Sequence, residues 1–202
     1  IGVIVAGNGA SDDAAKEALK NVAMQIAAMN PQYISRADIS ADAMAKLKEI
    51  TVDSALNAPD TLPKPILNKL IAKAVDGVWS AEDVAIYEEK KSNMNFLFNF
   101  LSKEAKAQLA ELAMADKDAI VADKIFSGLV EGRISKQVKE ISLLDQVYVK
   151  AEDGKQTVAQ YIAQVAKENN AQISVRSFVR FETGEGMEKK EEDFAAEVAK
   201  QM

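Results

Sequence analysis

The sequence contains no cysteine and no histidine. These absences exclude disulfides, thiolate nucleophiles, Cys/His zinc sites and every serine–histidine or cysteine–histidine relay. A site built from carboxylates alone stays open, but adjacent acids such as Glu88 and Glu89 do not converge on a pocket when they lie on a helix. We therefore expect neither an enzyme nor a metal or cofactor. The lack of cysteine also fits a cytoplasmic protein.

Long apolar runs and clusters of basic residues are absent as well. No apolar run approaches the roughly 20 residues that a membrane-spanning helix needs, and the first residues, IGVIVAGNG, lack the basic start of a signal peptide. The net charge is −6, with 25 basic against 31 acidic residues, whereas a phosphate backbone attracts clustered lysine and arginine. We expect no membrane and no nucleic-acid partner. Because the chain begins at Ile1, we expect a fragment of a longer protein.

Strand signals stand at both ends of the chain. Residues 1–6 are apolar and rich in β-branched types, and Gly7-Asn8-Gly9 then predicts a turn. Residues 147–149 are a second strand candidate. Residues 173–182 alternate with a period of two, which predicts a half-buried strand with Phe178 as an exception on the polar side. The apolar members of this alternation are Ile173, Val175, Val179 and Phe181.

Helical spacing dominates the rest of the sequence. Apolar residues recur at three- and four-residue intervals, and Thr157 is placed to cap a helix after the 147–149 strand. Ser80 with Asp83 resembles a capping box. Residues 93–101 are apolar around nearly the whole helix, which predicts burial within the fold, with a dimer contact as the second interpretation. The predicted helices cover about 11–29, 37–57, 66–76, 93–101, 103–115 and 118–144, with others that begin at about 80 and 157 and one more near the C-terminus.

This order of elements predicts an α+β fold. We expect the terminal strands to pair into a small antiparallel sheet with helices packed on it. The stretch between them then forms a long, mainly helical, coiled-coil-like excursion. Its two long helices, separated by further helices, would lie as an antiparallel hairpin.

Three stretches carry a resemblance that goes beyond these patterns. They are residues 1–5 with 22–31, residues 131–133 with 140–149, and residues 179–190 with 193–198, which read VRFETGEGMEKK and DFAAEV. In this order they resemble the elongation factor Ts family, the bacterial factors that speed nucleotide release from elongation factor Tu. The resemblance covers roughly residues 1–56 and 118–202. Residues 57–117 exceed the short coiled-coil hairpin usual in the family.

The resemblance implies a division of the chain. Residues 1–37 and 145–186 correspond to the family's C-terminal core subdomain. Residues 38–144 correspond to its helical dimerisation or coiled-coil region, with an insertion at about 57–117, and residues 187–202 to its C-terminal helix module. The family's Thr-Asp-Phe-Val segment, which disturbs the magnesium and phosphate site of the GTPase, does not occur in this sequence. The resemblance therefore implies exchange weaker than that of the complete factor.

The resemblance also implies a partner, elongation factor Tu, and a set of contact residues. In the family the core subdomain docks on the partner's third domain, and the terminal helix reaches its nucleotide-binding domain. Where the family commonly has Gln-Pro-Phe-Val, this chain has Gln-Val-Tyr-Val. The apolar residues of the terminal helix either contact the partner or seat that helix. The implied partner-binding residues are Gln146, Tyr148, Val149, Phe194, Val198, Gln201 and Met202.

Three alternatives remain beside nucleotide exchange. The helical region can serve self-association as a homodimer, or the chain can act as an adaptor without exchange activity. An enzyme that uses carboxylates alone is a third alternative, supported only by dispersed acidic residues.

Overall fold

The computed structural model describes residues 1–8 and 13–186. The chain divides into two compact units. The first, here called the α/β unit, comprises the described residues 1–8, 13–34 and 143–186. The second, the helical unit, comprises residues 35–142.

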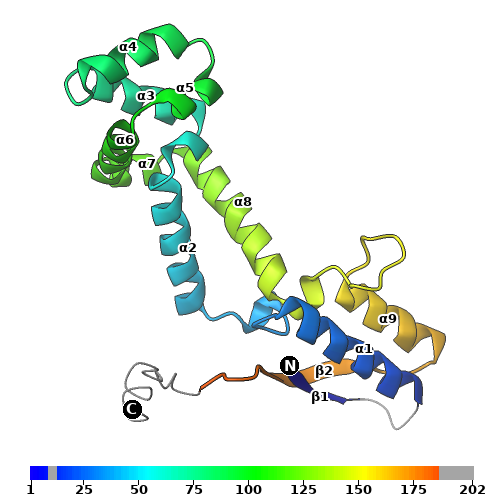
Figure 1. Cartoon of the computed structure of the whole chain (residues 1–202). Coiled ribbons are helices and arrows are strands. Elements are labelled where there is room, and N and C mark those ends of the chain that lie inside the picture. The colour runs from blue at the N-terminus through cyan, green and yellow to red at the C-terminus, as the bar shows by residue number, and fades with distance from the viewer. Residues whose placement is uncertain (9–12, 187–202) are drawn as a thin grey trace, which may run out of the picture. The chain divides into compact units, whose positions relative to one another are not determined.

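The α/β unit is built on a two-stranded antiparallel sheet. Strand β1 (Gly2–Asn8) pairs with β2 (Ser174–Phe181), so the two ends of the described chain meet. Helix α1 (Asp13–Met29) packs against both strands, and α9 (Val158–Glu168) packs against α1 and the short 3-10 helix η3 (Leu143–Asp145) (Figure 1). The core is formed by Val22, Ile26, Leu143, Tyr148, Val158 and Ile162. The predicted α+β class with a small antiparallel sheet is confirmed.

A β-bulge in β2 changes the face of the sheet on which its later side chains lie. Ala6 lies opposite Ser177, but Gly7 lies opposite Val175, so β2 carries one extra residue. Since side chains alternate with a period of two, one extra residue moves all later ones to the other face. Phe178 therefore packs against the core, whereas Val179 and Phe181 are about half exposed. The sequence-based assignment of Phe178 to the polar side was wrong for this reason.

The helical unit contains two long helices that lie side by side and run antiparallel, α2 (Ala41–Leu56) and α8 (Lys124–Ile141) (Figure 1). Among the described residues, none of the helices is both long enough and apolar enough to cross a membrane. The remaining elements are η1 (Arg36–Asp38), η2 (Pro59–Thr61), α3 (Lys64–Val75), α4 (Ala81–Lys90), α5 (Met94–Phe100), α6 (Lys103–Ala115) and α7 (Lys117–Val121).

The helix predicted over residues 118–144 is divided in the structure. Helix α7 ends at Val121, and Asp123 caps α8, where one carboxylate oxygen accepts hydrogen bonds from the backbone N–H groups of Ile125 and Phe126 at 2.8 and 3.2 Å. An aspartate at this position satisfies donors that a new helix leaves unpaired. The continuous apolar spacing concealed this cap.

Helix α5 buries only one of its faces. Leu97 is fully buried, but 56% of Phe96 and 52% of Phe100 are exposed. The side-chain ammonium of Lys90 lies 4.8 Å from the centre of the Phe100 ring, which is within the range of a cation–π contact. The prediction that the apolar residues of this segment are all buried within the fold was therefore wrong for these two phenylalanines.

A buried carboxylate links the starts of α4 and α6. Asp83 accepts hydrogen bonds from the hydroxyls of Ser80 and Ser102, at 2.8 and 2.9 Å, and from the backbone N–H of Ser102 at 2.9 Å. The hydroxyl of Ser80 caps α4 as predicted, but the carboxylate binds Ser102 instead of completing the capping box. Burial alone would raise the pKa of Asp83, and these three hydrogen bonds together lower it below its ordinary value.

We predict that Asp83→Asn destabilises the helical unit by about 1–3 kcal/mol, because the neutral amide presents N–H groups to groups that donate. In the unmodified chain, the stability that Asp83 contributes is present above the ordinary carboxyl pKa. It is lost as the pH falls through the lower pKa of the folded state. Urea unfolding followed by circular dichroism measures both effects. Glu82→Gln, an exposed neighbour in the same helical turn, is the control, and equal losses in the two variants would contradict the prediction.

Candidate functional site

The segment of residues 146–150 contains three of the partner-binding residues that the family resemblance implies. The structure separates them into inner and outer positions. Gln146 and Tyr148 are buried, at 4% and 5% exposure, whereas Val147 and Val149 are each 48% exposed. Of the predicted contacts in this segment, Val149 is thus the one that faces solvent. Phe194, Val198, Gln201 and Met202 lie outside the described residues.

A buried glutamine on α1 fixes the backbone of this segment. The side-chain oxygen of Gln25 accepts a hydrogen bond from the N–H of Val149 at 2.8 Å. Its amide nitrogen donates to the carbonyl of Val147 at 3.0 Å and to the side-chain oxygen of Gln146 at 3.2 Å. Gln25 itself is fully buried. Its amide group therefore supplies both kinds of hydrogen bond that a neighbouring strand would supply.

This arrangement explains why residues 147–149 do not form the predicted strand. In the described chain Val147 makes an isolated antiparallel bridge with Thr157, and the chain turns at Val149. The backbone groups that would continue a ladder are bonded to the Gln25 side chain instead. The β-branched residues did indicate extended backbone at Val147, but the prediction of a strand over residues 147–149 was wrong.

Aromatic stacking supports the inner side of the segment. The rings of Tyr148 and Tyr161, from α9, are 4.1 Å apart between centroids and inclined by 15°. Asn21 donates a hydrogen bond to the Tyr161 hydroxyl at 2.8 Å and accepts one from the ammonium of Lys150 at 2.9 Å. Burial, followed by the charge and hydrogen bond of Tyr161, raises the pKa of Tyr148 to about 12.

The chain after the segment is held by an aspartate turn. One oxygen of Asp153 accepts hydrogen bonds from the N–H groups of Lys155 and Gln156, both at 2.9 Å, which lowers the pKa of Asp153. Thr157 and Gln160 then form the capping box of α9, which confirms the predicted Thr157 cap. Backbone bonds from Tyr148 to Gln156, at 2.8 Å, and from Val158 to Gln146, at 3.0 Å, tie the segment to this turn.

A surface hollow of about 600 Å³ adjoins the segment. Tyr148, Lys150 and Tyr161 line it together with three acids, Glu152, Asp153 and Glu168. Within residues 1–8 and 13–186, no group of three or more acidic side chains is placed to hold a metal ion. The lowered pKa of Asp153 is also the wrong direction for a general acid. The hollow thus offers a polar contact surface beside two exposed valines.

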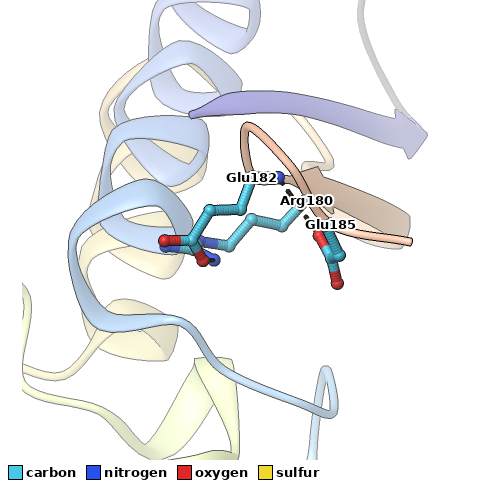
Figure 2. Close-up of polar contacts among 3 residues, drawn as sticks. All are labelled: Arg180, Glu182 and Glu185. Atoms are coloured by element: carbon cyan, nitrogen blue, oxygen red, sulfur yellow. Dashed lines mark hydrogen bonds and ion pairs between the residues drawn. The ribbon is translucent and has the colours of Figure 1, made fainter. Parts of the chain in front are cut away.

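The turn after β2 belongs to the third matching stretch. Figure 2 shows the Arg180 and Glu182 side chains running together, joined by an ion pair of 3.2 Å, with Glu185 on the other side of the turn. Glu185 accepts a hydrogen bond from the N–H of Glu182 at 3.1 Å. Gly184 and Gly186 adopt φ angles of 86° and 75°, a region that side chains disfavour. The two glycines thus turn the chain after β2.

Comparison with known proteins decides the family. The family model described as "Elongation factor TS" matches residues 1–90 and 82–185. The chain belongs to the elongation factor Ts family. It is 32% identical over 193 residues to the elongation factor Ts of Finegoldia magna, and 34% identical over 207 residues to that of Alkaliphilus metalliredigens. An 80-residue stretch is 55% identical to the elongation factor Ts of Clostridium acetobutylicum.

The matches cover nearly all of this chain in the two longer cases, but only about two thirds of each of those relatives. The matches include 96% of this chain for Finegoldia and all of it for Alkaliphilus, but only 62% and 67% of the relatives' own lengths. The Clostridium match includes 40% of this chain and 26% of the relative. At this coverage the two longer matches include residues 57–117 of this chain.

Sequence reasoning did not single out three residues that support the candidate site: Asn21, Gln25 and Tyr161. A signal for Gln25 was present, because it falls on the apolar stripe of α1, between the buried Val22 and Ile26. A polar residue on the core stripe of a helix requires hydrogen-bond partners from elsewhere in the fold. The sequence does not say where those partners come from, so the link to residues 146–149 was not predictable.

We predict that the free energy of unfolding falls between pH 10 and 12 and that Tyr148→Phe reduces this fall. An unfolded tyrosine loses its proton near pH 10, whereas Tyr148 keeps its proton until about pH 12, so the folded state binds more protons in this window. Urea midpoints measured between pH 9 and 11.5 test this, with Tyr33→Phe in the same unit as the control. Parallel pH profiles of the unmodified chain and Tyr148→Phe would refute the assignment.

Proposed function

We propose that this chain binds elongation factor Tu and promotes GDP release as part of an elongation factor Ts-type exchange factor. The proposal is supported mainly by the family match through residues 1–185, which includes segment 146–150. Val147 and Val149 offer apolar contact area on that segment, each about half exposed. We further propose partner contacts from Phe194, Val198, Gln201 and Met202, and action in the cytoplasm.

The proposed mechanism is non-covalent. A factor that binds a form of the GTPase with poor affinity for nucleotide weakens nucleotide binding, and nucleotide weakens the binding of the factor to the same extent. This linkage requires no nucleophile and no proton transfer. It is compatible with a chain that has neither cysteine nor histidine.

The extent of exchange is expected to be smaller than that of the complete factor. The sequence lacks the Thr-Asp-Phe-Val segment that the family resemblance associates with disturbance of the magnesium site. The chain also spans only 62% of the length of the Finegoldia relative. Residues 1–202 would then supply docking, with only a part of the effect on the nucleotide.

We predict saturable binding of this chain to elongation factor Tu and a modest acceleration of GDP release. Stopped-flow release of a fluorescent GDP analogue, with increasing amounts of the chain, measures both. Val149→Asp should weaken binding at least about tenfold, because a desolvated charge is costly in an apolar contact. Val179→Asp, at a similarly exposed valine of the α/β unit, is the matched control. Absence of binding by the unmodified chain, with elongation factor Tu of the same source, would refute the proposed function.

Self-association through the helical unit is the second candidate function. The exposed rings of Phe96 and Phe100, one helical turn apart on α5, favour it because adjacent exposed aromatic rings commonly mark contact surfaces. If this candidate is correct, light scattering should show a dimer that Phe96→Ser with Phe100→Ser converts to a monomer. A monomer of the unmodified chain at concentrations of about 1 mM would contradict it.

A further inference from the structure

We propose that Gln25 is a positioning residue that holds segment 146–150 in the conformation that binds elongation factor Tu. This inference rests on the proposed function and adds a division of labour to it. Val147 and Val149 provide the contact, whereas Gln146 and Tyr148 act from inside the chain's own fold. Nothing in the family resemblance assigned a role to Gln25.

The hydrogen bonds of Gln25 define the orientation of its amide group. Only the side-chain oxygen can accept from the N–H of Val149, and only the nitrogen can donate to the carbonyl of Val147. The second N–H of the same nitrogen reaches the side-chain oxygen of Gln146. One amide group on α1 thus forms hydrogen bonds with three residues of the segment, at positions 146, 147 and 149.

Packing alone does not explain a glutamine at this position. Gln25 is fully buried beside Ile26, on the side of α1 that contributes to the core. A methionine of similar length would fill the same space without the cost of burying an amide. The amide is therefore retained by its hydrogen bonds, and those bonds all end on segment 146–150.

Fixing this backbone has a direct consequence for docking. Val147 and Val149 flank Tyr148, whose ring is stacked on Tyr161 inside the unit. With the backbone bonded to Gln25 on one side and Tyr148 buried, the two valines are ordered before any partner arrives. A segment that is ordered in advance loses less conformational entropy on binding. Gln25 therefore acts on affinity through the segment without touching the partner.

Gln25→Met tests this role in the full chain. We expect amide hydrogen exchange at Val149 to accelerate about tenfold, because the bond to its N–H is lost, and affinity for elongation factor Tu to fall about tenfold. Gln25→Glu keeps an acceptor for Val149 but places a buried carboxylate against two oxygens, so its losses should be at least as large. Gln172→Met, at an exposed glutamine of the same unit, should leave both measurements unchanged.

A double-mutant cycle separates positioning from a general loss of stability. In a Val147→Ala, Val149→Ala background, Gln25→Met should cause less than a threefold further loss of affinity, because the contact that it positions is already removed. Full additivity of the two losses, or an unchanged affinity of Gln25→Met, would overturn the inference. If Gln25→Met does not fold, the same comparisons are made with Gln25→Leu, which also removes the three hydrogen bonds without burying a charge.

The proposed function and the positioning role of Gln25 can be refuted separately. If the unmodified chain does not bind elongation factor Tu, the proposed function is wrong, and the docking role of Gln25 is wrong with it. If the unmodified chain binds and Val149 exchanges at the same rate in Gln25→Met, only the positioning role is wrong.

Discussion

The antiparallel pairing of β1 with β2 is the interaction on which the α/β unit depends. It joins residues 2–8 to residues 174–181 across most of the sequence. This pairing provides the surface on which α1 packs, and α1 in turn packs against α9. Gln25 on α1 and Tyr161 on α9 then hold segment 146–150 from two directions. The position of two exposed valines thus depends on a sheet that is remote from them in sequence.

Polar groups inside the two units have a common function, which is to connect elements that apolar packing alone would leave free to shift. In the helical unit, Asp83 joins the starts of α4 and α6 through three hydrogen bonds. In the α/β unit, Gln25 joins α1 to a segment without regular structure. A buried polar group is costly unless its partners are in place, so each of these residues favours one arrangement over its neighbours.

The sequence predicted the features that follow from local patterns. The terminal strands, the Thr157 cap and the fold class were all available from periodicity and capping residues. The faces of β2 were not, because one bulge residue between Val175 and Ser177 reverses the alternation without changing its appearance in the sequence. The division between α7 and α8 was hidden because Asp123 also fits the surface of a continuous helix.

The candidate site was predictable only in part. The family resemblance placed Val149 among the partner contacts, and the structure gives it an exposed position. It could not distinguish Val149 from Tyr148, because inward and outward positions depend on hydrogen bonds to α1 that are more than 120 residues away in sequence. Burial of Gln146 and Tyr148 is a property of the assembled unit, not of their local sequence.

The proposed docking of elongation factor Tu on the α/β unit through segment 146–150 can be tested by amide hydrogen exchange of the full chain, measured with and without saturating elongation factor Tu. We expect strong protection on binding at residues 146–150 and weak protection at the exposed face of α5. Protection confined to the helical unit, with unchanged exchange at Val147 and Val149, would contradict it.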